Sequence, residues 1–386
     1  MAATILISAG EASGDLYAAS LVRVLQARDP EIRYFGCAGP RMQAAGVEPT
    51  IDASSLAVVG LVEVLRHIPR IYGEYRKLLR EVRRRRPEIA ILTDSPDFHL
   101  RLARQLKRLD IPVIYLVAPQ VWAWRKDRLP LMRRTIQRLL CIFPFEEAFF
   151  RGNGVPVTYI GHPLTRLIRP SAAIPELRAR FGAEPGIPLV ALLPGSRKGE
   201  ALRHLPDLLD AAERIHRTLP VRLILALPEG FSARADLSKF RERFSLSAIQ
   251  VQEGQTWDVL ACADLALAAS GTVTVEACLL NTPTVAFYRV NRLSWLIGRL
   301  LVRVPFYSMV NLIAGKRVIP ELIQDRLSGQ SLAAEALLLL QNRQARDEMR
   351  AELAKVSHSL SGPRDPMDAA ASAVEQLLKK EMVHVS

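Results

Sequence analysis

The alternation of short apolar strands with longer helical patterns limits most strongly what this chain can fold into. A repeated strand–helix–strand order builds a parallel sheet that is covered by helices on both faces. Such a sheet binds its ligands beyond the carboxyl ends of its strands. Because the alternation occurs twice, we predict an α/β fold with two doubly wound, Rossmann-like domains that face each other across a cleft. The predicted strands are residues 4–8, 32–36, 88–93, 112–117, 189–193, 221–227, 248–251, 265–268 and 284–288.

Length and composition support two domains. The 386 residues exceed the usual size of one domain core, and 49% of them are hydrophobic, which is enough to fill two cores. Prolines and small residues in 160–175 suit a hinge between the domains. We predict a first domain at 1–170 and a second at 171–345. Residues 346–386 are expected to form C-terminal helices that pack back on the first domain or on a partner chain.

The formal net charge of +13 indicates an anionic partner, which could be phosphate groups, nucleic acid or an acidic membrane surface. The four cysteines are scattered and form no Cys-x-x-Cys pattern, which fits a reducing compartment. No basic leader precedes the first apolar run, and no run of about eighteen apolar residues occurs. We therefore predict neither a signal peptide nor a membrane span. No cofactor is predicted.

A turn after the predicted strand at 265–268 suits the phosphates of a nucleotide. Ser270 and Gly271 have small side chains, and Thr272 is expected to cap a helix whose N-terminus attracts anions. Glu276 follows one helical turn later, where its carboxylate could accept hydrogen bonds from ribose hydroxyls. A capped structural helix with a solvated glutamate is the alternative interpretation.

A second turn follows the strand at 189–193. Gly195 allows close backbone approach, Ser196 can donate a hydrogen bond, and Arg197 can offset diphosphate charge. We expect both turns at the same edge of one sheet, although a basic turn can also be merely solvated. Because the chain has no Asp-x-Asp motif, we predict that no metal holds the diphosphate.

The loops of the first half carry acids. The loop at 8–15 would repel phosphate, so we expect it to bind sugar hydroxyls on the acceptor side, with a capping turn as the alternative. The residues assigned to this function are Gly10, Glu11, Ser13 and Gly14.

Two aspartates follow the strand at 88–93. We assign a general base to Asp94 and a helix N-cap to Asp97 on the acceptor side, and leave the reverse assignment open. Trp122 and Trp124 follow the next strand, where one of them could stack on a sugar; the alternative places both in the core.

An apolar stripe combined with strong positive charge indicates a membrane-facing segment. Nine Arg or Lys residues lie within 66–86, next to the apolar residues of 58–62. A basic amphipathic helix on anionic lipid explains both features, whereas an ordinary helix with a solvated basic face explains only the stripe. Residues 292–303 repeat the mixture. The residues predicted to face the membrane are Val58, Val59, Leu61 and Val62.

Ten motifs, taken in order, resemble those of the lipid-A-disaccharide synthase family. They are GEASGD at 10–15, CAGPRMQAAG at 37–46, VVGLVEVL at 58–65, TDSPDF at 93–98, VWAWR at 121–125, FPFE at 143–146, IGHPL at 160–164, LLPGSR at 192–197, ASGTVTVE at 269–276 and SMVNLIAGK at 308–316.

The resemblance implies an inverting, metal-independent glycosyltransferase of the GT-B type. It would transfer 2,3-diacylglucosamine from UDP-2,3-diacylglucosamine to 2,3-diacylglucosamine 1-phosphate, forming the β-1,6 disaccharide of lipid A and UDP. It also implies a cytoplasmic enzyme on the inner face of the inner membrane, with no nucleic acid partner; a homodimer is left open. The implied site residues are Asp94 for catalysis, Asn311 near the donor, and Arg197, Ser270, Gly271, Thr272 and Glu276 for UDP.

His99 stands where the family usually has asparagine, which changes the hydrogen bonds expected around the acceptor. Two other functions remain as alternatives. A UDP-sugar epimerase or a soluble glycosyltransferase of the same fold would not need the basic apolar stripe. A nucleic-acid-binding protein would spread its basic residues over a face with aromatic platforms.

Overall fold

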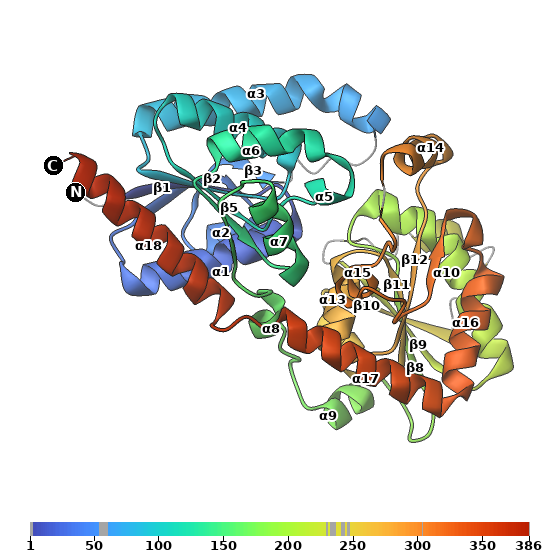
Figure 1. Cartoon of the computed structure of the whole chain (residues 1–386). Helices are drawn as coiled ribbons and strands as arrows, with labels where there is room; N and C mark the ends of the chain where they lie inside the picture. Colours follow the sequence, from blue (N-terminus) through green and yellow to red (C-terminus); the bar gives the residue numbers. More distant parts are fainter. Residues whose placement is uncertain are drawn as a thin grey trace. The chain divides into compact units, whose positions relative to one another are not determined.

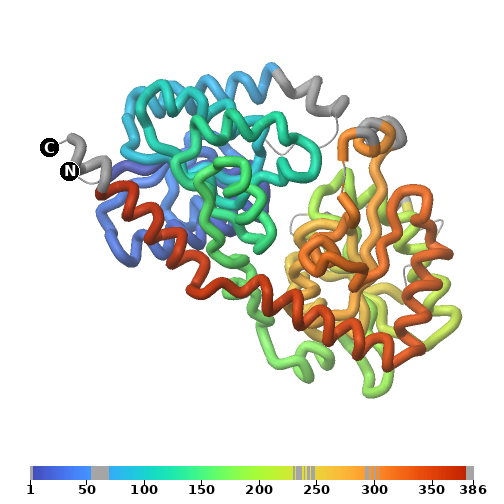
Figure 2. Tube along the Cα trace, in the orientation of Figure 1, coloured from blue at the N-terminus to red at the C-terminus, as the bar shows by residue number. Residues whose placement is uncertain are grey.

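The computed structural model describes residues 3–53, 61–228, 231, 237–240, 244, 248–302 and 304–385. Residue contacts divide the chain into two compact units, the first formed by 1–163 and 360–386 and the second by 164–359. Figure 2 follows the chain by colour to its red end, which belongs to the first unit. The expected C-terminal segment 346–386 is therefore shared between the two units. Within the described ranges, none of the helices has both the length and the apolar character that a membrane span requires.

The first unit is built on a parallel seven-stranded sheet with the order β3-β2-β1-β4-β5-β6-β7. The order changes direction between β1 and β4, and doubly wound sheets bind ligands at such a switch point. Ser8 pairs with Leu92 there, so the two strands end side by side. The strands are β1 (Thr4–Ser8), β2 (Arg33–Ala38), β3 (Glu48–Asp52), β4 (Ile89–Thr93), β5 (Val113–Leu116), β6 (Arg138–Cys141) and β7 (Val157–Tyr159).

Helices cover both faces of the first sheet (Figure 1). Leu6, Ala90 and Val113 share one core with Leu78 of α3 and Leu102 of α4. On the other face lies α1, with α18 packed beside it. The helices are α1 (Ala12–Arg28), α2 (Pro40–Ala44), α3 (Leu61–Arg85), α4 (Pro96–Arg108), α5 (Val121–Trp124), α6 (Leu129–Thr135), α7 (Pro144–Gly152) and α18 (Pro366–Val385).

The second unit repeats this plan with a six-stranded parallel sheet of order β10-β9-β8-β11-β12-β13. Its switch point lies between β8 and β11, where Leu193 pairs with Ala268. The predicted α/β class with two doubly wound sheets is therefore confirmed. The strands are β8 (Leu189–Leu193), β9 (Arg222–Leu227), β10 (Ile249–Glu253), β11 (Leu265–Ala269), β12 (Thr284–Tyr288) and β13 (Glu321–Ile323).

Side chains of β8 alternate between two cores, as the period of a strand requires. Val190 and Leu192 share a core with α10, α16 and α17. Leu189, Ala191 and Leu193 share the other core with α9, α12 and α13. The helices are α8 (Leu164–Leu167), α9 (Ile174–Arg180), α10 (Lys198–Thr218), α12 (Thr256–Cys262), α13 (Thr272–Leu279), α14 (Arg292–Leu301), α15 (Met309–Ala314), α16 (Gly329–Gln341) and α17 (Arg343–Leu360).

Candidate active site

Asp94 follows β4 directly, at the switch point of the first sheet. Asp94 and Ser95 both have a left-handed backbone, with φ of 51° and 35°, which residues other than glycine rarely adopt. This elbow, residues 94–95, directs the Asp94 carboxylate to the loop after β1. Oδ1 accepts a hydrogen bond from Gly10 N at 2.8 Å, and Oδ2 accepts one from Glu11 N at 3.1 Å. Backbone strain of this kind costs about 1–3 kcal/mol per residue, so the surroundings must hold it.

Two glycines leave room for the elbow. A Cβ atom at Gly10 would lie 2.3 Å from Ser95 Oγ, and a Cβ atom at Gly14 would lie 1.7 Å from Asp94 Oδ2. A side chain at either position would displace the elbow or its carboxylate. Gly10 and Gly14 therefore lie against the elbow. Only glycine at these two positions leaves enough space for the Asp94 and Ser95 side chains.

Burial raises the pKa of Asp94 to about 8, and the charge of Glu11 adds to the shift. Hydrogen bonds from Gly10, Ser95 and Glu11 oppose the shift because they favour the carboxylate. The side chain keeps 12% exposure. A partly exposed carboxyl group whose pKa lies near neutrality is well matched to accept a proton from a substrate hydroxyl.

The carbonyl oxygen of Asp94 accepts hydrogen bonds from two buried side chains. His99 Nδ1 lies 3.0 Å from this oxygen, and the Tyr115 hydroxyl donates to it at 2.5 Å. His99 Nε2 lies 2.7 Å from Ser8 Oγ. Burial lowers the pKa of His99 to about 4, so the ring is neutral: Nδ1–H donates to Asp94, and Nε2 accepts from the Ser8 hydroxyl. Neither Ser8 nor Tyr115 was predicted as a site residue, although each is a polar residue in a short apolar strand.

Asp97 is not the helix cap that the sequence predicted. Ser95 is the N-cap residue of α4, and the helix begins at Pro96. Asp97 already lies in the first turn, where its carboxylate pairs with Arg128 and is 70% exposed. Proline at the first helical position explains the difference, because its fixed φ begins the helix at residue 96, two residues earlier than a cap at Asp97 would.

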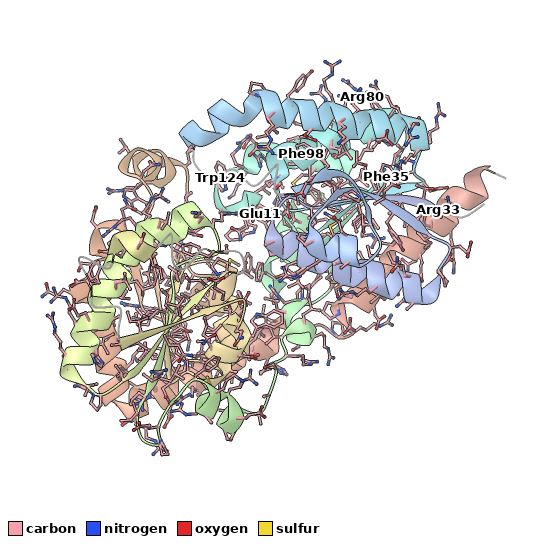
Figure 3. All side chains as sticks on the ribbon, turned by 180° about the vertical axis from the view of Figure 1, so that it is seen from behind. Glu11, Arg33, Phe35, Arg80, Phe98 and Trp124 are labelled. Atoms are coloured by element: carbon pink, nitrogen blue, oxygen red, sulfur yellow. The ribbon has the colours of Figure 1, made fainter. Side chains whose placement is uncertain are left out.

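The remaining residues of the first loop have different roles. Asp15 is buried, and its carboxylate accepts from Arg41 N at 2.9 Å and from Met42 N at 3.0 Å, at the start of α2. Asp15 thus fills the capping role that was the alternative for this loop. Glu11 is the N-cap residue of α1 (Figure 3), and Ser13 lies half-buried in the first turn of that helix.

The two tryptophans have different environments. Trp122 donates its indole N–H to the buried Glu146 at 3.1 Å and packs edge-on against Phe145, so it lies half-buried against the core. Burial raises the pKa of Glu146 to about 8. Trp124 is 43% exposed (Figure 3), and the Arg128 guanidinium lies 5.8 Å from its ring centre. Trp124 is therefore the tryptophan that is accessible to a sugar.

The two predicted phosphate turns leave the second sheet at its switch point. Residues 194–197 join β8 to α10, and residues 270–271 join β11 to α13. The predicted cap at Thr272 is wrong: Gly271 is the N-cap residue, and Thr272 is the first residue of the helix. The Ser270 hydroxyl donates to Tyr307 O at 2.9 Å, so it is held within the protein.

The glycines of these turns are present for different reasons. Gly195 has a φ of 127°, and a Cβ atom there would lie 2.7 Å from Glu200 Oε2, so the fold requires glycine. Gly271 has a φ of 171°, which any residue adopts, and a Cβ atom there would meet no described atom within 4 Å. The fold does not need glycine at 271, and the space that a Cβ atom would occupy there is open.

The other predicted donor residues lie beside these turns. Ser196 is exposed, and Arg197 is the half-buried N-cap residue of α10. Glu276 is half-buried on α13, one turn after Thr272, which places both side chains on one face of the helix. The part of the chain that the structure describes contains no group of three or more His, Cys, Asp or Glu side chains that could hold a metal ion.

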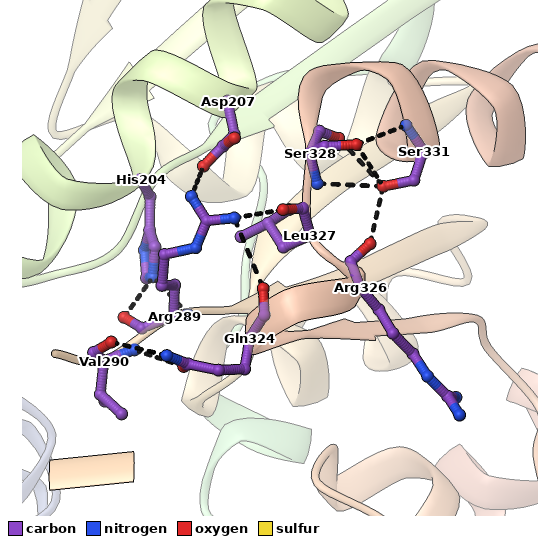
Figure 4. Close-up of polar contacts among 9 residues, drawn as sticks. All are labelled: His204, Asp207, Arg289, Val290, Gln324, Arg326, Leu327, Ser328 and Ser331. Atoms are coloured by element: carbon purple, nitrogen blue, oxygen red, sulfur yellow. Dashed lines mark hydrogen bonds and ion pairs between the residues drawn. The ribbon is translucent and has the colours of Figure 1, made fainter. Parts of the chain in front are cut away.

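His204 of α10 ties the turn at 194–197 to the end of β12, and Figure 4 shows its contact with Arg289. Its Nδ1 lies 2.8 Å from Pro194 O, and its Nε2 accepts from Arg289 N at 3.0 Å. Burial lowers the pKa of His204, which favours the neutral ring that this donor–acceptor pattern requires. Arg289 in turn pairs with Asp207 and donates to Gln324 O at 3.4 Å. No sequence pattern predicted these contacts, because most of them join residues far apart in the chain.

Asn311 is buried, and its side chain is used within the protein. Nδ2 donates to Ile319 O at 2.9 Å and to Glu321 Oε1 at 2.8 Å. Oδ1 accepts from Val318 N at 2.7 Å and from Ile319 N at 3.0 Å. Glu321 also accepts from Ser308 N at 2.8 Å. These four bonds use both ends of the Asn311 amide within the protein, where they join the start of α15 to residues 318–321.

The predicted membrane segment is only partly described. Val58 and Val59 lie outside the described residues, as do the side chains of Leu61 and Val62. Further along α3, Leu78 is fully buried in the core, as the ordinary-helix alternative requires.

Two Rossmann-like units, each built on a doubly wound parallel sheet, are the architecture of the GT-B class of proteins. The glycotransferase of kitacinnamycin superposes with a TM-score of 0.66 at 14% identity, covering 98% of this chain and 100% of that one. The UDP-GlcNAc 2-epimerase from Neisseria meningitidis gives a TM-score of 0.64 at 11% identity, covering 98% and 100%. These likenesses establish the fold.

Sequence similarity is more specific. The family model described as lipid-A-disaccharide synthetase matches residues 5–374. The lipid-A-disaccharide synthase of Solibacter usitatus (strain Ellin6076) is 56% identical over 382 residues, 99% of each chain. The chain belongs to the lipid-A-disaccharide synthetase family. It is a glycosyltransferase that forms the lipid A disaccharide, and the epimerase alternative is not favoured.

Proposed function

We propose that the protein transfers 2,3-diacylglucosamine from UDP-2,3-diacylglucosamine to the 6-hydroxyl of 2,3-diacylglucosamine 1-phosphate, with Asp94 as the general base. The proton of the hydroxyl passes to the Asp94 carboxylate while its oxygen bonds to the anomeric carbon. The bond from that carbon to UDP breaks, and the electron pair leaves on UDP. Direct displacement of this kind inverts the anomeric centre.

The placement of Asp94 carries the proposal. Asp94 lies at the switch point of a doubly wound sheet, where such folds bind ligands. Backbone N–H groups hold both of its carboxylate oxygens in place there. A positioned base of suitable pKa contributes roughly 10²–10⁴-fold to proton transfer. The accessible Trp124, with Glu11, Ser13 and Asp97, is the predicted acceptor contact surface.

The donor is assigned to the switch point of the second sheet. The N-termini of α10 and α13 offer backbone N–H groups and a positive dipole to the diphosphate. Arg197 adds positive charge, and Glu276 is placed to bind the ribose. The turns themselves are lined by Gly195, Ser196, Ser270, Gly271 and Thr272. These groups would serve without a metal, so we expect EDTA to leave the transfer rate unchanged.

Both proposed substrates carry acyl chains, so the enzyme must work at a lipid surface. We infer peripheral attachment to the cytoplasmic face of the inner membrane through α3. The described basic side chains that support this are the exposed Arg76, Lys77, Arg80 and Arg83.

The test compares Asp94→Asn with Asp97→Asn in mixed micelles, following UDP release from the proposed substrates. We expect Asp94→Asn to lower kcat by roughly 10²–10⁴-fold, with the Kd for UDP unchanged, because the carboxylate touches the acceptor. Asp97→Asn should lower kcat less than about tenfold, because the proton acceptor remains and only one acceptor contact and the ion pair with Arg128 are weakened. A working Asp94→Asn enzyme would refute the base assignment, and a dead Asp97→Asn enzyme would move the base to Asp97.

A further inference from the structure

The elbow of Asp94 and Ser95 needs an external support, and the structure contains one. Two consecutive non-glycine residues with left-handed φ do not hold themselves in place. The carboxylate is bonded on one side, to Gly10 N and Glu11 N. The backbone of Asp94 is bonded on the other side, through the carbonyl oxygen of this residue.

That carbonyl oxygen accepts from His99 Nδ1 at 3.0 Å and from the Tyr115 hydroxyl at 2.5 Å. Both side chains are fully buried, so water does not compete with them for these hydrogen bonds. The His99 ring is itself oriented by Ser8 Oγ, 2.7 Å from Nε2. Ser8 ends β1, Tyr115 belongs to β5 and His99 to α4, so three elements converge on one peptide unit.

We propose that His99, Tyr115 and Ser8 form a clamp on the Asp94 carbonyl that positions the Asp94 carboxylate for proton transfer. This inference rests on the proposed function of Asp94 as the base. The clamp residues are positioning residues, because they contact the Asp94 peptide and not the reacting atoms. They act by fixing ψ of Asp94 and φ of Ser95, the torsions on either side of the bonded peptide, and thus the direction in which the carboxylate leaves the backbone.

The geometry of His99 allows a matched pair of substitutions. In His99→Asn the side-chain amide occupies the place of Nδ1, so it can still donate to the Asp94 carbonyl. In His99→Gln the amide reaches instead to the place of Nε2, so it can satisfy Ser8 but not Asp94. Tyr115→Phe removes the second donor with the loss of a single oxygen atom.

We expect His99→Gln and Tyr115→Phe each to lower kcat by roughly 10- to 100-fold, the range for a small misplacement of a reacting group. The KM values and the Kd for UDP should change less than about threefold, because substrate contacts remain. His99→Asn should keep kcat within a few-fold of the parent. Thermal unfolding of each purified variant measures whether the fold is intact.

Parental kcat in both His99→Gln and Tyr115→Phe would overturn the clamp, and an inactive Asp94→Asn enzyme beside them would leave the base assignment standing. An equal loss in His99→Asn and His99→Gln would also overturn it, because packing rather than the bond to Asp94 would then decide the rate. If His99→Gln does not fold, the kcat of Tyr115→Phe is compared with that of His99→Asn, and the clamp requires the lower value in Tyr115→Phe. An active Asp94→Asn enzyme would remove the proposed function itself.

Discussion

At the scale of single residues, the environment of Asp94 sets the pH dependence of the reaction. Burial raises the pKa of Asp94 to about 8. A base acts only when it is unprotonated, so kcat should rise with pH through about 8 and level off above it. An ordinary aspartate, with a pKa of about 4, would give a flat profile from pH 6 to 9. The kcat profile over this range, measured with saturating substrates, decides between the two.

The residual activity of Asp94→Asn provides the control, because its profile should lack this rising limb. Glu11 contributes to the raised pKa of Asp94 through its negative charge, so Glu11→Gln should move the limb to lower pH. A limb that stays in place in Asp94→Asn would belong to another group.

Single residues also show what the sequence could reveal about the site. Asp94 was predictable, because an acid that ends an apolar strand of a parallel sheet falls at the ligand edge. The support around it was not, because His99, Tyr115 and Ser8 meet only after three elements have packed. The fully bonded side chain of Asn311 was likewise hidden, because its partners at 318–321 lie in a loop and a short strand without a periodic pattern.

At the scale of elements, the start of α13 separates a structural role from a ligand role. Gly271 has open space where a Cβ atom would stand, and its φ suits any residue. Gly271→Ala should therefore leave the melting temperature unchanged. If the diphosphate occupies that space, the added methyl group should weaken UDP binding by about tenfold or more, the loss expected when backbone N–H groups can no longer reach a phosphate. Calorimetric titration with UDP measures this.

Gly152→Ala is the matched control, because a Cβ atom at Gly152 also meets no described atom within 4 Å and the residue lies on α7 in the other unit. It should change neither stability nor UDP binding by a measurable amount. Unaltered UDP affinity in Gly271→Ala would place the diphosphate elsewhere.

The elements themselves were predictable where the pattern was strong. Each predicted strand appears in the structure, because central parallel strands are continuous apolar runs. Four strands were missed. Among them, β3 lies at a sheet edge and contains Pro49. An edge strand tolerates proline, but a proline in the sequence argues against predicting a strand. The edge strands β7 and β13 have three residues each, too few for any period to show.

At the scale of the whole molecule, the chain passes from one unit to the other twice, at 163–164 and at 359–360. The two passages touch through His162 N, which donates to Leu360 O at 2.8 Å. A Cβ atom at Gly362 would lie 2.7 Å from Ile160 O, and one at Gly161 would lie 2.6 Å from Gly362 N. Because these close contacts are with backbone atoms, neither segment can move aside to accommodate a side chain at Gly161 or Gly362.

Gly362→Ala should therefore destabilise the protein by about 1–3 kcal/mol, the usual cost of overpacking a tight contact. A lowered melting temperature relative to the parent and to Gly152→Ala is the expected result. Unchanged stability in Gly362→Ala would show that the two passages separate at little cost.

Attachment to the membrane is the other property of the whole molecule that can be tested. Arg76, Arg80 and Arg83 lie exposed on α3, whereas Arg85 is bound to Glu48 and lies over the Phe35 ring. Each basic residue near an anionic surface contributes about 1 kcal/mol. Replacing Arg76, Arg80 and Arg83 together by glutamine should thus weaken binding to phosphatidylglycerol vesicles by roughly two orders of magnitude, measured by sedimentation at 0.1 M salt.

The control must remove the same charge from other surfaces. Arg151, Arg217 and Arg343 are 70%, 71% and 88% exposed, and they lie on α7, α10 and α17. Their replacement by glutamine lowers the net charge by the same three units while leaving α3 intact, so vesicle binding should stay near the parental value. If both triple variants lose binding equally, the protein is attracted by its overall charge, and α3 is an ordinary helix with a solvated basic face. If neither loses binding, the attachment depends on apolar contacts and not on these arginines.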